Sequence, residues 1–181
     1  NDTGTGDLVL ALNPGLEIIT LKVNGNLVDF KRDMHLVTVS STALGNELSV
    51  EVELDYSGKV DNSVLFPDVS DDAHRALNRQ NLAVYGKMYS LVAPNYVLLT
   101  REANWYPFVA SKQYWTKYQF SDFSLKVETK EGLTAISQGR DEELSPGEFS
   151  FTPETKLNAM SLTIGNYVVE KTVIDSVEMR I

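Results

Sequence analysis

The chain has 181 residues, 43% of them hydrophobic, so it is long and apolar enough to bury a core, and this composition excludes intrinsic disorder. Its formal net charge is -9, and it has no cluster of Lys and Arg of the kind that binds phosphate backbones, which argues against nucleic acid as a partner. It contains no cysteine, which excludes disulfides and thiolate metal sites but leaves the cellular compartment open.

The first predicted elements are short strands joined by turns. Residues 8–12 form an apolar run that ends at Asn13-Pro14-Gly15, where Pro fixes φ and Gly is expected to supply a positive φ. The pair Asn24-Gly25 is typical of a two-residue hairpin turn, because both central residues of such a turn need a positive φ. This turn predicts that residues 16–23 pair with residues 27–31.

Two more strands and one helix follow in the first half of the chain. Residues 36–39 predict a strand, and residues 48–54 alternate between apolar and polar side chains, which predicts another. We expect an antiparallel meander with one solvated face. Residues 71–81 carry acids ahead of apolar positions, which predicts a short helix of roughly two to three turns.

The segment 95–139 contains the aromatic stretch Trp105-Tyr106-Pro107. A strand is predicted at 96–100, ahead of this stretch. Two interpretations remain open for the aromatic residues. They form either a core plug where the chain crosses between sheets, or a wall that contacts a ligand or partner.

The remainder of the chain predicts strands with one acidic connection. Alternation predicts a strand at 121–127, and a turn at 130–132 leads into another at 133–137. Residues 138–147 include four consecutive charges and predict a solvated loop. Later strands are predicted at 149–151, 160–164, 167–170 and 173–181. With about ten strands and one short helix, the predicted fold is an all-β antiparallel sandwich or a curved, saddle-like sheet, formed by residues 1–181 as a single domain.

The sequence contains no complete active site. The two histidines, His35 and His74, lie in unrelated contexts, and the zinc motif His-Glu-x-x-His is absent. Nucleophile elbows and phosphate-binding loops are also absent. Pairs of acids such as Glu142 and Glu143 are expected on solvated faces of a chain with 25 acids. We therefore predict no catalytic residue and no metal ligand in this segment.

The order and spacing of several short motifs resemble the N-terminal β domain of the M1 family of zinc aminopeptidases, the gluzincins. These motifs lie at residues 12–16, 23–25, 48–58, 105–107, 123–127, 133–139 and 162–167. Their variants look most similar to a branch in which the peptidase-like module is fused to a bacterial membrane protein of the ABC-transporter permease type. Because strand-like patterns run close to both ends of the chain, we expect a fragment of a longer protein.

The resemblance implies partners and a location. In the family, the catalytic domain follows this one and supplies the zinc ligands, the general base Glu and a Gly-x-Met-Glu-Asn strand. We therefore expect no cofactor in this segment, with zinc in the absent catalytic domain of the same parent chain. A peptide substrate is expected to bind through that parent. The branch implies the extracytoplasmic (periplasmic) side of a bacterial inner membrane, with membrane contact through transmembrane segments outside this chain.

The resemblance also implies a substrate-binding residue. The family's N-terminal domain lends the cleft an acid or amide that holds the substrate's α-amino group, and Glu102 is the nearest equivalent by position. Trp105 and Tyr106 beside it are expected to line the same cleft. This chain departs from the family because the Asp-Glu-Pro half of the motif after Pro107 is replaced by residues 108–111.

Two other functions remain open. The first is a freestanding binding or adhesion module that presents Trp105, Tyr106, Trp115 and Tyr118 to a sugar or a protein. The second is an independent small enzyme, which the sequence favours least.

Overall fold

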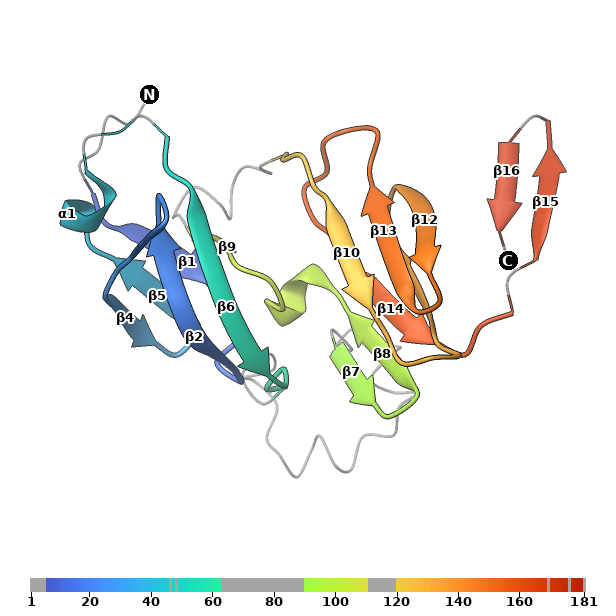
Figure 1. Cartoon of the computed structure of the whole chain (residues 1–181), viewed down its shortest axis with the longest axis horizontal. Coiled ribbons are helices and arrows are strands. Elements are labelled where there is room, and N and C mark those ends of the chain that lie inside the picture. The colour runs from blue at the N-terminus through green and yellow to red at the C-terminus, as the bar shows by residue number, and fades with distance from the viewer. Residues whose placement is uncertain are drawn as a thin grey trace.

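The computed structural model describes residues 6–45, 47, 49–62, 90–110, 120–168, 170–175 and 177–180. Regular structure in these ranges is mostly antiparallel strand, with one short α-helix and one 3-10 turn. This confirms the all-β prediction, although the described part alone contains sixteen strands rather than about ten. The strands form two lobes, on the left and right of Figure 1, and a separate hairpin beyond the second lobe.

The first lobe contains two sheets that pack against each other, with strand orders β4-β5-β1-β9 and β3-β2-β6. Its elements are β1 Leu8–Ala11, β2 Leu16–Val23, β3 Asn26–Leu27, β4 Phe30–Asp33, β5 Leu36–Val39, α1 Ser41–Leu44, β6 Val52–Gly58 and β9 Phe108–Val109. Alternate side chains of the strands point inward and form the core of this lobe. The core residues are Leu10, Leu12, Leu16, Leu21, Val23, Val37 and Val39.

The pairing of the first lobe differs from the predicted meander. Asn24 and Gly25 have the expected positive φ of 48° and 78°, but the hairpin pairs only two residues of β3 with β2. The main partner of β2 is β6, whereas β4 joins β5 in the other sheet. The backbone N–H of Val28 still donates to Leu21 of β2 at 3.1 Å, so the predicted pairing of 16–23 with 27–31 is wrong beyond Val28. The chain leaves β2 there because Val28 and Phe30 pack against the core between the sheets.

Three local predictions in the first lobe need correction. Gly15 does not have a positive φ. Glycine is required there because the backbone of Lys59, the residue after β6, leaves no room for a Cβ. The strand predicted at 48–54 begins at Val52. The helix α1, which Ser40 caps through the backbone N–H of Thr42, was not predicted. The helix predicted at 71–81 lies outside the described residues.

The second lobe also contains two packed sheets, with strand orders β10-β13-β12 and β11-β14-β8-β7. Its strands are β7 Ser90–Ala93, β8 Tyr96–Leu99, β10 Leu125–Glu128, β11 Thr134–Ser137, β12 Arg140–Ser145, β13 Glu148–Thr152 and β14 Leu162–Gly165. The core between them contains Ala135, Phe149, Phe151 and Leu162. The turn at 130–132 forms with Gly132 at φ 82°, yet it carries the chain from one sheet to the other.

The charged segment 138–147 is not a loop. Residues 140–145 form β12, which pairs with β13 along its length. All six residues are exposed, as expected for a solvated segment, but hydrogen bonds to β13 on one side of the backbone make it a strand. Residues 166–168 are not strand, and the segment predicted as one strand at 173–181 is part of a hairpin, β15 Lys171–Ile174 and β16 Val177–Arg180.

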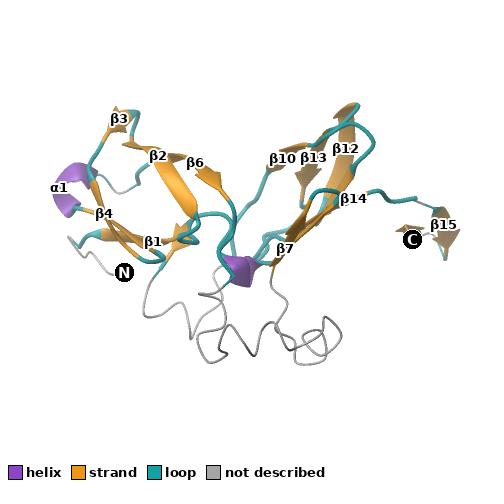
Figure 2. Ribbon diagram, turned by 90° about the horizontal axis from the view of Figure 1, so that it is seen from below, coloured by secondary structure: helices purple, strands orange, loops and turns teal. Residues whose placement is uncertain are grey.

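The chain crosses from the second lobe to the first between β8 and β9. The crossing begins with η2, the 3-10 turn Arg101–Ala103, which lies between the lobes in Figures 1 and 2. The aromatic stretch 105–107 follows directly. Trp105 packs against the core of the second lobe, while Phe108 and Val109 pair with β1 of the first. None of the described helices is long and apolar enough to span a membrane.

Candidate functional site

Glu102 lies exposed at the middle of η2. The turn is closed by the backbone N–H of Ala103, which donates to Thr100 at 3.1 Å, and by that of Asn104, which donates to Arg101 at 2.9 Å. The Thr100 hydroxyl donates to the Glu102 carboxylate at 2.6 Å. An ionised carboxylate has about four acceptor positions, so this one bond orients Glu102 and leaves acceptor capacity for a ligand.

Asn13 holds η2 against the first lobe. Its side-chain nitrogen donates to the carbonyl oxygen of Ala103 at 3.1 Å, and its backbone N–H donates to that of Asn104 at 2.8 Å. Asn13 is fully buried. Because a buried amide is stable only when its polar atoms are paired, these bonds define where η2 lies.

Further bonds fix the loop that carries Asn13. Its side-chain oxygen accepts from the backbone N–H groups of Gly15 at 2.9 Å and Asp61 at 2.7 Å, and its side-chain nitrogen also donates to the Asp61 carbonyl at 3.2 Å. The Arg32 guanidinium donates to the carbonyl oxygens of Asn13 at 2.7 Å and Leu16 at 2.6 Å. The platform beneath Glu102 is therefore a connected hydrogen-bond network.

Trp105 is half-buried and joins the two lobes. Its ring packs against the core of the second lobe, and its carbonyl oxygen accepts from the Tyr56 hydroxyl of β6 at 3.1 Å. The indole Nε1 is buried and has no acceptor in the described part of the chain. The contacts that the structure shows for Trp105 are those of a packing residue.

Tyr106 is also half-buried. Its hydroxyl accepts from the backbone N–H of Met160 at 3.1 Å, and its ring makes edge contacts with Trp105 (4.9 Å between centroids) and Phe123 (6.1 Å). Burial raises the pKa of Tyr106, although the hydrogen bond from Met160 and the charge of Arg101 act in the opposite direction.

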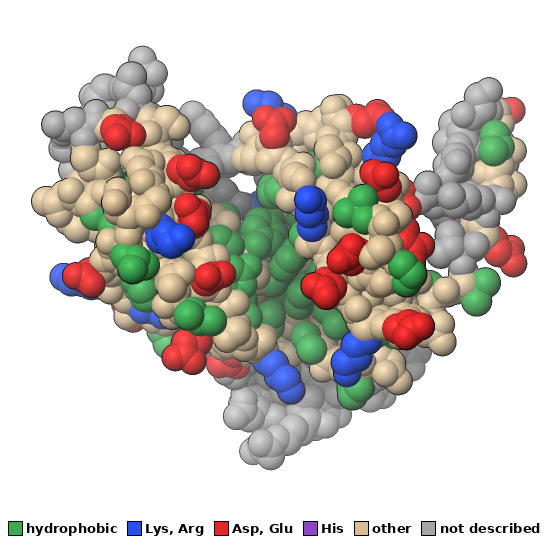
Figure 3. All heavy atoms as spheres, viewed as in Figure 1, with side chains coloured by type: hydrophobic (Ala, Val, Ile, Leu, Met, Phe, Trp, Pro, Cys, Tyr) green, Lys and Arg blue, Asp and Glu red, His purple; other side chains and the backbone are tan. Residues whose placement is uncertain are grey.

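The three residues singled out from the sequence therefore gather at one crossing, with different surroundings. Glu102 faces solvent, whereas Trp105 and Tyr106 pack on each other. This arrangement gives no support to a platform of exposed aromatics, and Trp115 and Tyr118 lie outside the described residues. Hydrophobic side chains do gather in the hollow between the two lobes, as Figure 3 shows.

The described residues do not form a metal centre. Among them, no three His, Cys, Asp or Glu side chains are placed so that they hold one ion. His35 lies exposed after β4, and His74 lies outside the described residues. What Glu102 offers chemically is a single negative charge on a fixed turn, suited to a cationic group.

The roles of Asn13 and Arg32 in supporting this turn were not predicted from the sequence. The Asn13-Pro14-Gly15 stretch predicted only a local turn. The partners of Asn13 lie 48 and 90 positions away in the sequence, so no local pattern marks them. The one local sign was an Asn between an apolar run that ends at Leu12 and the turn residues Pro14 and Gly15.

Comparison with solved structures returns zinc peptidases. A two-domain M1 zinc metallopeptidase variant bound to L-tryptophan matches 97% of this chain and 39% of its own, with 16% identity and a TM-score of 0.65. The M1 zinc metallopeptidase of Deinococcus radiodurans matches 93% of this chain and 36% of its own, at 15% identity and a TM-score of 0.59. Legionella pneumophila aminopeptidase A in complex with aspartic acid matches 99% and 20%, at 12% identity and a TM-score of 0.57.

The TM-scores show a shared fold, and the sequence identities of 12–16% are too low to show more than that. No family model matches the sequence, and no curated protein matches it. The chain spans well under half the length of each of these peptidases.

Proposed function

We propose that this chain is the non-catalytic N-terminal β domain of an M1-like zinc metallopeptidase, in which it walls the substrate cleft. The observation that carries the proposal is the asymmetry of the fold match, which takes in 97% of this chain and 39% of a two-domain M1 enzyme. Almost the whole chain thus corresponds to one part of such an enzyme. The order of sequence motifs supports assigning that part to the N-terminal domain.

Within this role, Glu102 receives the α-ammonium group of the substrate. A cation that loses its water in a cleft needs a charged acceptor, and a carboxylate supplies one. Support comes from the geometry of η2, since Glu102 is exposed while its turn is anchored by Thr100 and Asn13. Trp105 and Tyr106 brace the wall behind it through their packing contacts.

The zinc of this reaction belongs to the catalytic domain, outside this chain. The described residues do not fit a zinc site, so no step of the hydrolysis is assigned to them. The catalytic domain is the partner of this chain, and a peptide is the substrate that both domains enclose.

The proposal includes a membrane-associated parent on the extracytoplasmic side of a bacterial inner membrane. Its support is the sequence resemblance to modules fused to ABC-transporter permease-type proteins. Protease accessibility of the full-length parent in spheroplasts tests it. Cleavage within this domain from outside is expected, and protection until the membrane is lysed would contradict the location.

The Glu102 assignment is tested in the full-length parent. Steady-state hydrolysis of an aminoacyl p-nitroanilide is compared between wild type, Glu102→Gln and the matched control Glu131→Gln, an acid exposed on a distant turn. Removing a charged hydrogen bond to the ammonium costs about 1.5–3 kcal/mol, or about tenfold or more in kcat/KM. A substrate analogue that lacks the α-amino group should be hydrolysed equally by wild type and Glu102→Gln.

Two results would overturn the proposal in different ways. An unchanged kcat/KM for Glu102→Gln would remove the amine anchor but leave the domain assignment. Zinc bound at one ion per chain, or turnover of aminoacyl substrates by the purified chain alone, would sink the assignment of a non-catalytic domain.

A further inference from the structure

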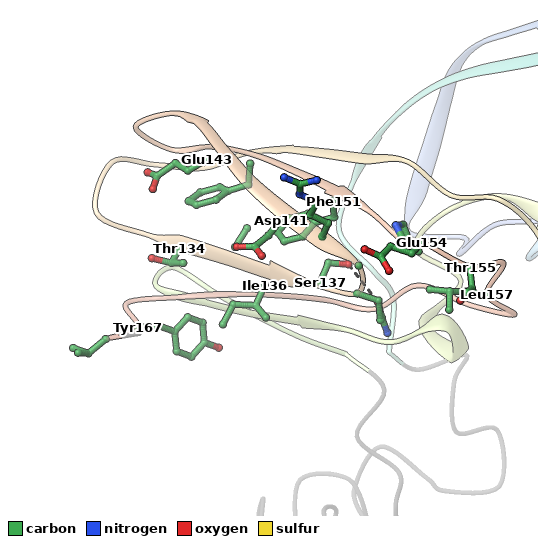
Figure 4. A pocket seen from close by; sticks show the side chains of 17 residues that line it. Thr134, Ile136, Ser137, Asp141, Glu143, Phe151, Glu154, Thr155, Leu157 and Tyr167 are labelled. Carbon is green, nitrogen blue, oxygen red and sulfur yellow. Dashed lines mark hydrogen bonds between the residues drawn. The ribbon is translucent and has the colours of Figure 1, made fainter. Parts of the chain in front are cut away.

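An open groove lies in the second lobe. It runs between the edge strands of the two sheets, β11 in one sheet and β12 in the other. Its volume is about 1100 Å³, and strands β11 and β12 form its two sides (Figure 4). The residues that matter for its chemistry are Ile136, Asp141, Glu143, Phe151, Glu154 and Tyr167. The groove is separate from η2 and Glu102, which do not line it.

One side of the groove is acidic. Asp141, Glu143 and Glu154 line it, and Arg140 is its one basic lining residue. In the ladder with β13, Asp141 lies opposite Phe151 and Glu143 lies opposite Phe149. Cross-strand neighbours share a face of the sheet, so these two acids point toward the inner side of the sandwich, and Glu142 between them points away.

The rest of the groove lining combines apolar and aromatic residues with the polar residues Thr134, Ser137, Gln138 and Thr155. Phe149 and Phe151 belong to the core of the lobe and form its floor. Ile136, which is 43% exposed on β11, and Tyr167 both line the groove (Figure 4). A ligand in the groove therefore meets acidic side chains together with a mixed polar and apolar surface.

The two strands that flank the groove are edge strands. Among the described residues, β12 pairs only with β13 and β11 pairs only with β14. Each therefore has a row of backbone N–H and C=O groups that no described strand uses. Such edges accept added strands unless something blocks them. Inward-pointing charges and the irregularity of β12 between Glu143 and Ser145 hinder the addition of most strands. A strand of opposite charge is the kind that these acids still favour, because opposite charges across a strand pair attract.

We propose that this groove binds an extended peptide segment with Lys or Arg at alternate positions, which adds to β12 as a further strand. Backbone groups of the segment pair with the side of β12 that no described strand occupies, and its basic side chains face the groove acids Glu143 and Glu154. The six residues of β12 span about 20 Å, enough for a segment of similar length. The proposal stands independently of the peptidase assignment.

The test uses the purified chain and a short fluorescent peptide in which Lys and Arg alternate with Thr. Fluorescence anisotropy should report saturable binding that weakens as salt is raised, because exposed charges are screened. A peptide with Glu in place of the bases should not bind. N-methylation of the backbone amides that face β12 should also abolish binding, because strand addition needs those donors.

Matched variants locate the site. Glu143→Lys should weaken binding about tenfold or more, whereas Glu142→Lys, its neighbour on the opposite face, should change the affinity by less than about twofold. Asp141 is avoided because it already interacts within the chain. Circular dichroism melts of both variants confirm folding, and amide chemical shifts of labelled protein should move along β11 and β12.

Any of four results would overturn the proposal, and the first three concern binding. They are the absence of saturable binding, equal binding of the acidic peptide, and equal effects of Glu142→Lys and Glu143→Lys. Shift changes confined to surfaces outside β11 and β12 would do the same.

Discussion

The side-chain nitrogen of Asn13 donates a hydrogen bond to the carbonyl oxygen of Ala103 at 3.1 Å, although the two residues are 90 positions apart. Asn13 belongs to the turn between β1 and β2, and Ala103 closes the 3-10 turn that presents Glu102. One buried amide thus ties the first lobe to the candidate site.

Asn13→Ala should destabilise the chain by about 2–4 kcal/mol. The change removes four side-chain hydrogen bonds, among them the bond to the carbonyl oxygen of Ala103, a residue that is 0% exposed. Urea denaturation followed by circular dichroism measures the loss. The control is Asn26→Ala, since Asn26 makes an exposed bond to a neighbouring carbonyl and should cost less than about 0.5 kcal/mol. Equal losses for both variants would refute the role of Asn13.

Gly15→Ala should be strongly destabilising even though Gly15 does not have a positive φ. A Cβ there would lie 2.0 Å from the carbonyl oxygen of Lys59, so the loop and the end of β6 must move apart. We expect a loss of about 2 kcal/mol or more in the free energy of unfolding. Gly6→Ala is the matched control, because a Cβ at Gly6 meets nothing within 4 Å. A stable Gly15→Ala variant would contradict the close approach.

Tyr106→Phe should change the stability of the chain and its dependence on pH. Burial raises the pKa of Tyr106 above its ordinary value of about 10. As pH rises, the unfolded chain therefore releases the phenol proton before the folded chain does. The contribution of the neutral hydroxyl to the free energy of unfolding is complete below pH about 10 and is lost as pH rises through the folded-state pKa.

Urea titrations of wild type and Tyr106→Phe at neutral pH and above pH about 10 measure both effects. At neutral pH the variant should lose about 1 kcal/mol, because the backbone N–H of Met160 loses its acceptor. In alkali its stability should fall less steeply than that of the wild type. Some fall should remain, since burial also raises the pKa of Tyr56. Parallel pH profiles would show that the Tyr106 hydroxyl is not buried.

Phe151→Ala should remove about 3–5 kcal/mol of stability, because the ring is 1% exposed at the centre of the second core and its loss leaves a cavity. Phe120→Ala, at a ring that is 61% exposed, should cost about 0.5 kcal/mol or less. Thermal melts of the two variants give the comparison. A small effect of Phe151→Ala would mean that the two sheets of this lobe do not pack as described.

The local elements were largely predictable. Turn chemistry at Asn24-Gly25 and Gly132, and alternation around Val52, Leu125 and Phe149, predicted turns and strands that the structure contains. These signals work because the φ of a turn residue and the two-residue period of a strand are properties of a few neighbouring residues. The charged run 140–145 was missed as a strand because its pairing with β13, rather than its composition, makes it one.

Strand pairing could not be read in the same way. The alternation of residues 16–23 is compatible with pairing to the next strand or to β6, and the burial of Val28 and Phe30 between two sheets decides for β6. Glu102 was predicted as a site residue because it lies before the aromatic stretch 105–107, at the position that corresponds to the family's acid or amide. Its exposure and its anchoring by Asn13 depend on contacts across the whole first half of the chain.

The sequence by itself determined an all-β chain with turns at Asn24-Gly25 and Gly132 and without a recognisable zinc motif, because local conformation and residue chemistry are set by neighbouring residues. The tertiary structure alone decided which strands share a sheet, where the crossing with Glu102 lies and that acidic β12 is the last described strand of its sheet. The physical reason is that apolar faces must be buried and buried polar groups must be paired, and both conditions are met by residues far apart in the chain.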